Sequence, residues 1–320
     1  MSDLGFVALT LALAATTYSF FSLGLGLKNG EERLVASGKK GLHAAAVLLT
    51  LAILGLLYSL VTRDFQVEYV ASHTSRDLPL SYTISALWSG QEGVLLFWSY
   101  LLSLFGSVVV LRDRQRGNPL PACSVLVMAG PQAFFLMLLI SVANPFRTLD
   151  YVPANGLGMN YLLQNPAVLW HRPMVLLGCV GFMVPLAFTL AVLISGRLKD
   201  PYVPTVRPWA LISWLSLGLG TLLGAWWAYA ELGWGLDWAW DPAASASLLP
   251  RRTATALVHS LMVRGTRMKI SHIALSVATL ALCIFGTAIS GSGMIGPALA
   301  FSVSSVGLYL LGFLTLIIFA

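Results

Sequence analysis

The sequence predicts an all-α polytopic membrane protein with about nine transmembrane helices. Hydrophobic residues make up 57% of the 320-residue chain and charged residues only 10%, which is more apolar than a soluble core requires. The apolar residues form long continuous runs. A helix needs about 20 such residues to cross a bilayer, whereas a membrane-barrel strand alternates over about ten. The runs therefore favour helices.

Nine apolar segments are typical of membrane-spanning helices. The first has no basic region before it and is longer than a signal-peptide core, so we interpret it as a retained helix. We expect one transmembrane domain over residues 1–320. The chain stops at "LTLIIFA" with no polar tail, which predicts a missing C-terminal part. The predicted spans are 4–27, 42–62, 92–111, 122–143, 173–195, 208–230, 246–263, 270–290 and 298–319.

Lysines and arginines are distributed unevenly between the alternating connections. Thirteen of the 19 fall in one set of connections and its edges, and six fall in the other. The positive-inside rule places the richer set in the cytoplasm. The N-terminus is then outside, the C-terminus is cytoplasmic, and three long segments lie on the outer face: 63–91, 144–172 and 231–250. Topology therefore accounts for the +6 net charge, and no nucleic-acid partner is expected.

Tryptophans are concentrated at the last of these outer segments. Half of the ten tryptophans fall between Trp226 and Trp240, and Asp237 and Asp241 stand beside them. An aromatic belt at the membrane interface explains scattered tryptophans. A cluster interleaved with glycine, aspartate and proline indicates a folded loop instead. Such a surface suits a large flat ligand, and haem is one that packs on aromatic rings and takes axial imidazoles.

Five histidines are the candidate metal ligands. His171 lies at the outer mouth of the fifth span, and His259 lies inside the seventh, where an imidazole must hydrogen-bond, bind a metal or face a cavity. For each, iron ligation and a bond to a carbonyl are both open interpretations. His43 and His272 lie near the cytoplasmic edge, which favours interfacial roles. His73 lies in an outer loop and is expected to be solvated.

Other chemistry is not indicated. Cys123, Cys179 and Cys283 are isolated inside predicted spans, so we expect buried core residues. The sequence has no HExxH, GxSxG or GxxxxGK[ST] motif, which excludes the common metalloprotease, hydrolase and phosphate-loop classes.

The segment "GWGLDWAWDPAASASLLP" resembles the signature W-G-x-x-W-x-W-D-P-x-E-N-x-S of membrane proteins that handle haem in cytochrome c biogenesis. Three further segments resemble one branch, the CcmF/NrfE haem lyase family, in the same order along the chain. They are "VASHTSRDLPLSYTISALWSGQEGVLLFW", "LLQNPAVLWHRPMVLLGCVGFMVPLAF" and "TATALVHSLMV". The resemblance runs from residue 60 to residue 305, roughly, and its motifs are specific.

The resemblance implies that the protein attaches haem covalently, through thioethers, to apocytochrome c on the outer face of a bacterial inner membrane, with the mitochondrial inner membrane as the alternative. It implies a haem chaperone, apocytochrome c, other maturation subunits and the lipid bilayer as partners. It also implies haem b as a cofactor held within the membrane. His171 matches an outer haem ligand and His259 a ligand of haem b. The residues that match the haem-receiving loop are Trp234, Trp238, Trp240 and Asp241.

This chain departs from the family pattern at several positions. Ala244 and Ser245 replace an acid and an amide, Asp237 replaces a tryptophan, and Arg251-Arg252 replaces Trp-Leu. Leu299 stands where the family has a second outer histidine. The resemblance implies that the second ligand of haem b lies in a later helix, and this sequence ends before it.

Three interpretations therefore remain open. The chain is one part of a split haem lyase that a second chain completes, or it is a divergent, non-catalytic structural or haem-b-only subunit. In a third arrangement one haem binds between His259 and His272, which fall at similar depth across one helical hairpin.

Overall fold

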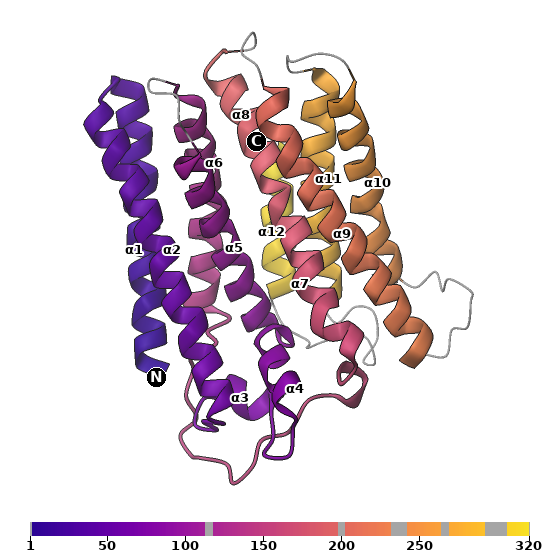
Figure 1. The fold of residues 1–320 in the computed structure, drawn as a ribbon. Helices are drawn as coiled ribbons and strands as arrows, with labels where there is room; N and C mark the ends of the chain where they lie inside the picture. Colours follow the sequence, from indigo (N-terminus) through magenta and orange to yellow (C-terminus); the bar gives the residue numbers. More distant parts are fainter. Residues whose placement is uncertain are drawn as a thin grey trace.

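The structure, a computed structural model, is a bundle of long helices that run in alternating directions (Figure 1). It describes residues 2–112, 118–197, 202–231, 242–263, 269–291 and 306–319. Within these ranges, the side chains of 242–247, 290–291 and 316–319 are outside the described set.

The helices follow one another with short connections at one end of the bundle and long ones at the other. They are α1 (Ser2–Asn29), α2 (Glu32–Val61), α3 (Glu68–His73), α4 (Leu80–Ser85), η1 (Ala86–Trp88), α5 (Gln91–Leu111), α6 (Leu120–Ser141), η2 (Tyr161–Leu163), α7 (Pro166–Gly181), α8 (Met183–Ile194), α9 (Val203–Glu231), α10 (Pro242–Met262), α11 (Ile270–Gly291) and α12 (Val306–Phe319).

In the described residues, a helix overlaps each of the nine predicted spans; the fifth is divided at Phe182 into α7 and α8, and the described part of the ninth is 306–319. In the described part of the chain, seven segments are long and apolar enough to cross a membrane. The multi-pass all-α class is therefore confirmed. The count of nine stays a prediction, because α12 has only 14 residues and α10 begins with a less apolar stretch that includes Arg251 and Arg252.

Small residues allow the helices to approach closely. In the first pair, α1 against α2, the Ser19 hydroxyl donates to the Gly38 carbonyl over 2.8 Å. A Cβ added at Gly38 would lie 2.7 Å from Leu23 Cγ. Dispersion contacts and hydrogen bonds of this kind hold membrane helices together, because lipid tails remove the hydrophobic driving force. Small residues also allow close approach between α7 and α9, at the candidate site.

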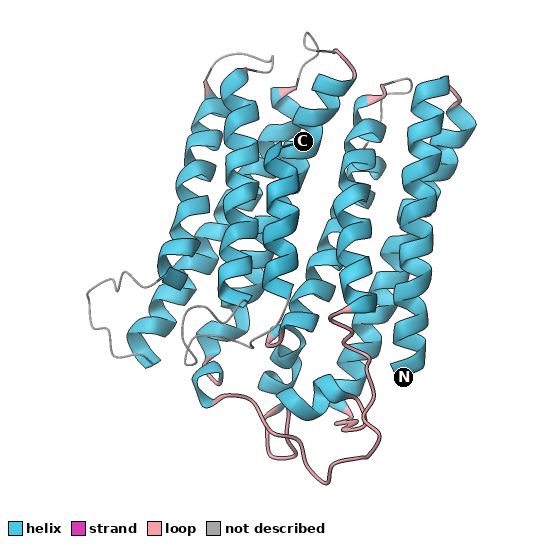
Figure 2. Cartoon of the chain, turned by 180° about the vertical axis from the view of Figure 1, so that it is seen from behind, coloured by secondary structure: helices cyan, strands magenta, loops and turns pink. Residues whose placement is uncertain are grey.

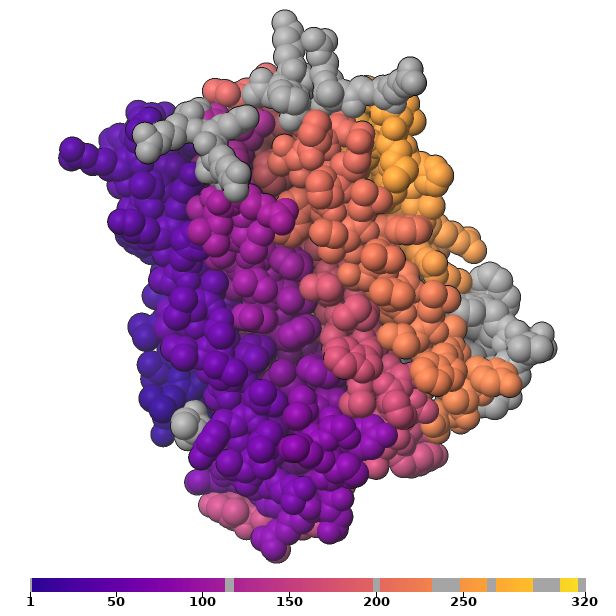
Figure 3. Space-filling view, viewed as in Figure 1, coloured from indigo at the N-terminus to yellow at the C-terminus, as the bar shows by residue number. Residues whose placement is uncertain are grey.

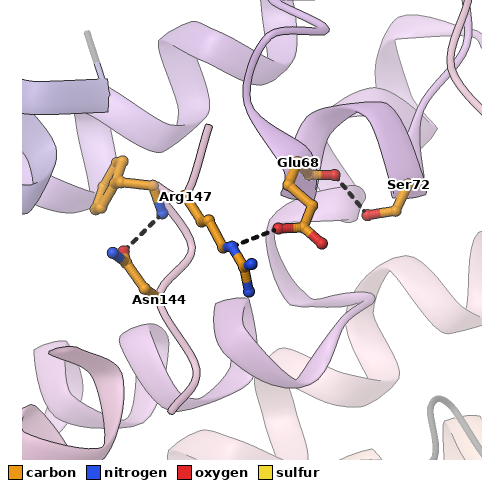
Figure 4. A network of polar contacts seen from close by, with 5 residues as sticks. Glu68, Ser72, Asn144 and Arg147 are labelled. Carbon is orange, nitrogen blue, oxygen red and sulfur yellow. Dashed lines mark hydrogen bonds and ion pairs between the residues drawn. The ribbon is translucent and has the colours of Figure 1, made fainter. Parts of the chain in front are cut away.

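One end of the bundle, called the loop end below, carries segments 63–90 and 144–165 (Figure 2). Backbone hydrogen bonds tie the two segments together: Glu68 N–H donates to Arg147 O over 2.9 Å, and Leu157 N–H donates to Ala71 O over 2.7 Å. Figure 4 shows the Arg147–Glu68 ion pair, with Nε–Oε2 at 3.3 Å. The segments therefore form one packed layer rather than independent loops.

The structure overturns the expectation that His73 is solvated. Its ring ends α3, stacks on Tyr69 with 4.4 Å between ring centroids, and has Nδ1 2.9 Å from the Tyr69 carbonyl oxygen. A Cβ added at Gly90 would lie 2.5 Å from His73 Nε2. Burial lowers the pKa of His73 below its usual 6.5, against a raising contribution from the Tyr69 hydrogen bond. Segment 63–90 is folded, so its histidine is half-buried rather than solvated.

Candidate functional site

His171 lies near the start of α7, at the loop end, because the sequence before it begins the helix there. Asn165 is the N-cap, and its Oδ1 accepts a hydrogen bond from Ala167 N–H over 2.8 Å. Pro166 occupies the first helical position, where a missing N–H costs nothing. The cap therefore sets the position of His171, about one and a half turns into the helix.

The His171 ring is oriented by another helix. Its Nδ1 lies 2.7 Å from the carbonyl oxygen of Gly220 on α9. A carbonyl only accepts, so Nδ1 carries the proton and donates it, which leaves the lone pair of Nε2 available. Among the described residues no hydrogen bond engages Nε2. Metal-ligating histidines use this arrangement, because the carbonyl bond fixes the tautomer and raises the basicity of the other nitrogen.

Glycines on α9 make room for this ring. A Cβ added at Gly224 would lie 2.6 Å from His171 Cε1, and one added at Gly220 would lie 2.8 Å from Val175 N. The α7 side is equally tight, since a Cβ at Gly178 would lie 2.7 Å from Leu217 N. The α7–α9 contact is therefore a glycine seam, and the imidazole occupies its loop-end section (Figure 3 shows α7 and α9 meeting at this end).

The neighbouring Arg172 anchors α7 on its other side. Its guanidinium Nη1 donates to the carbonyl oxygens of Trp88 and Ser89 over 2.5 and 2.7 Å. These carbonyls end η1, just before α5. The sequence did not predict a role at the site for Arg172 or for the α9 glycines Gly220 and Gly224. For Arg172, the signal in the sequence was a charged residue at the mouth of an apolar span.

His259 has different surroundings. It lies in the last turn of α10, at the end of the bundle opposite to His171, and its side chain is exposed. The structure therefore does not bring the two proposed iron ligands together. In the described residues, no group of three or more histidine, cysteine, aspartate or glutamate side chains gathers into a metal site.

His272 is buried, with 1% of its surface exposed. Its Nδ1 accepts from Lys269 N–H over 3.2 Å, and its Nε2 donates to Ser260 O over 3.2 Å. The ring also stacks on Tyr202 with centroids 5.8 Å apart. Both nitrogens are engaged by the protein, so the arrangement favours a lock between α10 and α11 and leaves no ring nitrogen of His272 for iron.

The predicted haem-receiving residues Trp234, Trp238, Trp240 and Asp241 lie outside the described residues, as does Leu299. The helices on either side of this stretch, α9 and α10, both reach the loop end. Three aromatic side chains on the neighbouring described helices are exposed: Trp170 near the start of α7, and Trp226 and Tyr229 near the end of α9. The three cysteines are free and buried, as expected.

The residues present fit an axial haem contact at His171, because the Gly220 bond leaves Nε2 as a donor to iron. His259 fits one only if a further protein segment covers its face of α10, since the described chain leaves that side chain exposed.

The chain resembles known proteins over nearly its whole length. Residues 88–295 match the family described as Cytochrome C assembly protein. The cytochrome c-type biogenesis protein CcmF of Escherichia coli is 36% identical over 98% of this chain and 48% of the relative. NrfE of Haemophilus influenzae is 34% identical over 97% of this chain and 49% of the relative.

A solved structure, titled Cytochrome c Heme Lyase CcmF, matches with a TM-score of 0.81 and 29% identity, over 99% of this chain and 49% of that one. The chain thus spans about half the length of the relatives that it matches. On the family match, the identities and the shared fold, the chain belongs to the cytochrome c assembly protein family, in its CcmF/NrfE branch.

Proposed function

We propose that this chain positions haem for covalent attachment to apocytochrome c, as a haem lyase or as one part of a split lyase. The observation that carries the proposal is the His171 Nδ1–H bond to the Gly220 carbonyl at 2.7 Å. It holds an imidazole at the loop end of a membrane bundle, with an unprotonated Nε2 that no described residue engages. Membership of the CcmF/NrfE branch supports haem as the ligand.

We place the loop end outside the cytoplasm, in a bacterial inner membrane, with the mitochondrial inner membrane as the alternative. The distribution of lysine and arginine supports this orientation. A haem chaperone and apocytochrome c would then approach the end that carries His171, together with other maturation subunits.

In this proposal haem is the substrate, and the protein acts mainly by orientation. His171 Nε2 would bind the iron, and the tryptophan-rich stretch that contains Trp234, Trp238, Trp240 and Asp241 would receive the ring. Each cysteine S–H of apocytochrome c adds across a vinyl C=C, so sulfur bonds one carbon and hydrogen the other. Arg172 would keep the mouth of α7 in place from the opposite side, through its bonds to Trp88 and Ser89.

Haem b is the proposed resident cofactor, with His259 as one ligand and electron transfer as its chemistry. Because His259 is exposed on α10, the second ligand must come from a segment outside the described chain, such as a partner chain. The relatives are about twice as long, which leaves room for such a segment. Where no partner is present, we expect weak haem b binding.

A non-catalytic structural or haem-b-only subunit is the second candidate. Leu299 favours it, because the resemblance places a histidine at that position.

One experiment separates the two candidates. Membranes with the native chain, His171→Ala, His259→Ala and the control His43→Ala would be compared for holocytochrome c and for the Soret absorbance of the purified protein. Haem lyase activity predicts that His171→Ala abolishes holocytochrome c, with the protein still in the membrane. Unchanged holocytochrome c in His171→Ala would favour the structural subunit, and an iron-free native preparation would reject haem binding altogether.

A further inference from the structure

A second contact, away from the imidazole, joins the helices that hold His171. Asn165 uses both ends of its side-chain amide. Its Oδ1 caps α7 by accepting from Ala167 N–H, and its Nδ2 donates to Glu231 Oε1 over 2.6 Å, a bond between residues 66 positions apart. Hydrogen bonds to a carboxylate are shorter than neutral ones, and this one forms at the exposed surface of the loop end. The cap of the histidine helix is therefore bonded to the last residue of α9.

An indole bond supports the same junction. Trp227, one turn before Glu231, donates its Nε1–H to the carbonyl oxygen of Leu162 over 2.7 Å. With the His171–Gly220 bond, the loop-end part of α9 is held to residues 162–171 at three points. These points cover about 16 Å of α9. The junction fixes both the rotation and the height of α9 relative to α7.

We propose that Asn165 and Glu231 are a positioning pair for His171. By holding the end of α9 to the cap of α7, they keep the Gly220 carbonyl where it accepts the Nδ1 proton and so maintain the tautomer with an unprotonated Nε2. The consequence for haem rests on the proposed function. The effect on the imidazole itself does not, because it involves only residues of this chain.

The pair can be exchanged without losing the cap. Asn165→Asp keeps an oxygen for Ala167 N–H but places a second carboxylate against Glu231. Glu231→Gln keeps an acceptor for Asn165 and removes the charge, so a smaller loss is expected. In the double variant, the amide introduced on α9 donates to the carboxylate introduced at the α7 cap, which restores the bond with its direction reversed. Glu68→Gln removes one negative charge, as Glu231→Gln does, but from the Arg147 ion pair elsewhere at the loop end. It is the matched control for Glu231→Gln.

The readout that needs no haem is ¹⁵N NMR of histidine-labelled protein in nanodiscs, which distinguishes the two imidazole tautomers. His171→Gln identifies the His171 signal. We expect the native Nδ1–H form to be lost in Asn165→Asp and recovered in the double variant. A haem titration of the same proteins should follow the same order, with the dissociation constant raised about tenfold in Asn165→Asp, at the lower end of outer-shell effects.

Two outcomes would overturn the proposal: an unchanged His171 tautomer in Asn165→Asp, or a double variant no better than Asn165→Asp. A tautomer change in Glu68→Gln as large as that in Glu231→Gln would also overturn it, since the effect would then follow the loss of one negative charge at the loop end and not the contact with Asn165. If the tautomer follows the expected order and no protein binds haem, the positioning pair stands and the proposed function fails.

Discussion

His171 and His259 are both histidines on helices of one bundle, yet their burial and hydrogen bonding differ. His171 is half-buried, its Nδ1 is bonded to a carbonyl of another helix, and glycines provide space for its ring. His259 is exposed on α10. The difference teaches that this chain orients one of the two imidazoles through its own contacts. The other lies at a surface, and under the proposed function it needs a further segment to complete its site.

The largest expected effect comes from filling the space around His171. Gly224→Leu puts a side chain where a Cβ alone would lie 2.6 Å from His171 Cε1, so either the ring is displaced from the Gly220 carbonyl or α7 and α9 separate. We expect a loss of about 3 kcal/mol in the free energy of unfolding, at the upper end for overpacking, and the loss of haem binding at His171. Thermal unfolding in nanodiscs and a haem titration would measure both.

Gly55→Leu is the control for this change, because a Cβ at Gly55 on α2 meets nothing within 4 Å. If Gly224→Leu were as stable as Gly55→Leu and bound haem normally, the glycine seam between α7 and α9 would not be what positions the His171 ring.

We expect an intermediate loss of stability from His272→Ala, at the contact between α10 and α11. His272→Ala removes a ring that bonds Lys269 N–H and Ser260 O. Leaving these groups without partners should lower the free energy of unfolding by about 2 kcal/mol. His259→Ala should change it by less than about 0.5 kcal/mol, as for other exposed positions. Chemical unfolding of both variants checks this order.

The reverse order, with His259→Ala the more damaging, would mean that His259 packs within the chain. The comparison with His171 would then be wrong.

The smallest effect concerns pH and the loop end. His73 has a pKa below 6.5 in the folded protein because desolvation beside Tyr69 disfavours its charged form, with Glu92 and Arg172 as its charged neighbours. The unfolded chain binds the proton more readily, so stability is full above pH 6.5 and decreases as the pH falls below it. The slope cannot exceed about 1.4 kcal/mol per pH unit for one proton.

Thermal unfolding between pH 7.5 and 5, compared with His73→Gln, would measure this slope. The variant should flatten the pH dependence in that range. An equal slope in both proteins would assign the effect to another group.

Much of the fold could be predicted because membrane helices are encoded locally. About 20 apolar residues suffice to predict a span, and a helix overlaps each predicted segment over the residues that the structure describes. The roles of single residues were harder. His73 was expected in solvent because the short helix α3 and the layer over it depend on segment 144–165, far along the chain. Arg172 was missed because its acceptors, Trp88 and Ser89, lie more than 80 positions away.

The sequence by itself determined the class of the protein, its helical segments and its family resemblance, since apolar runs and motifs are properties of consecutive residues. Only the tertiary structure decided which histidine is oriented by a carbonyl, which is locked by two bonds and which is exposed. An imidazole becomes a ligand through its tautomer and its access, and both are set by backbone groups of another helix. Those groups meet His171 only after α9 has packed against α7.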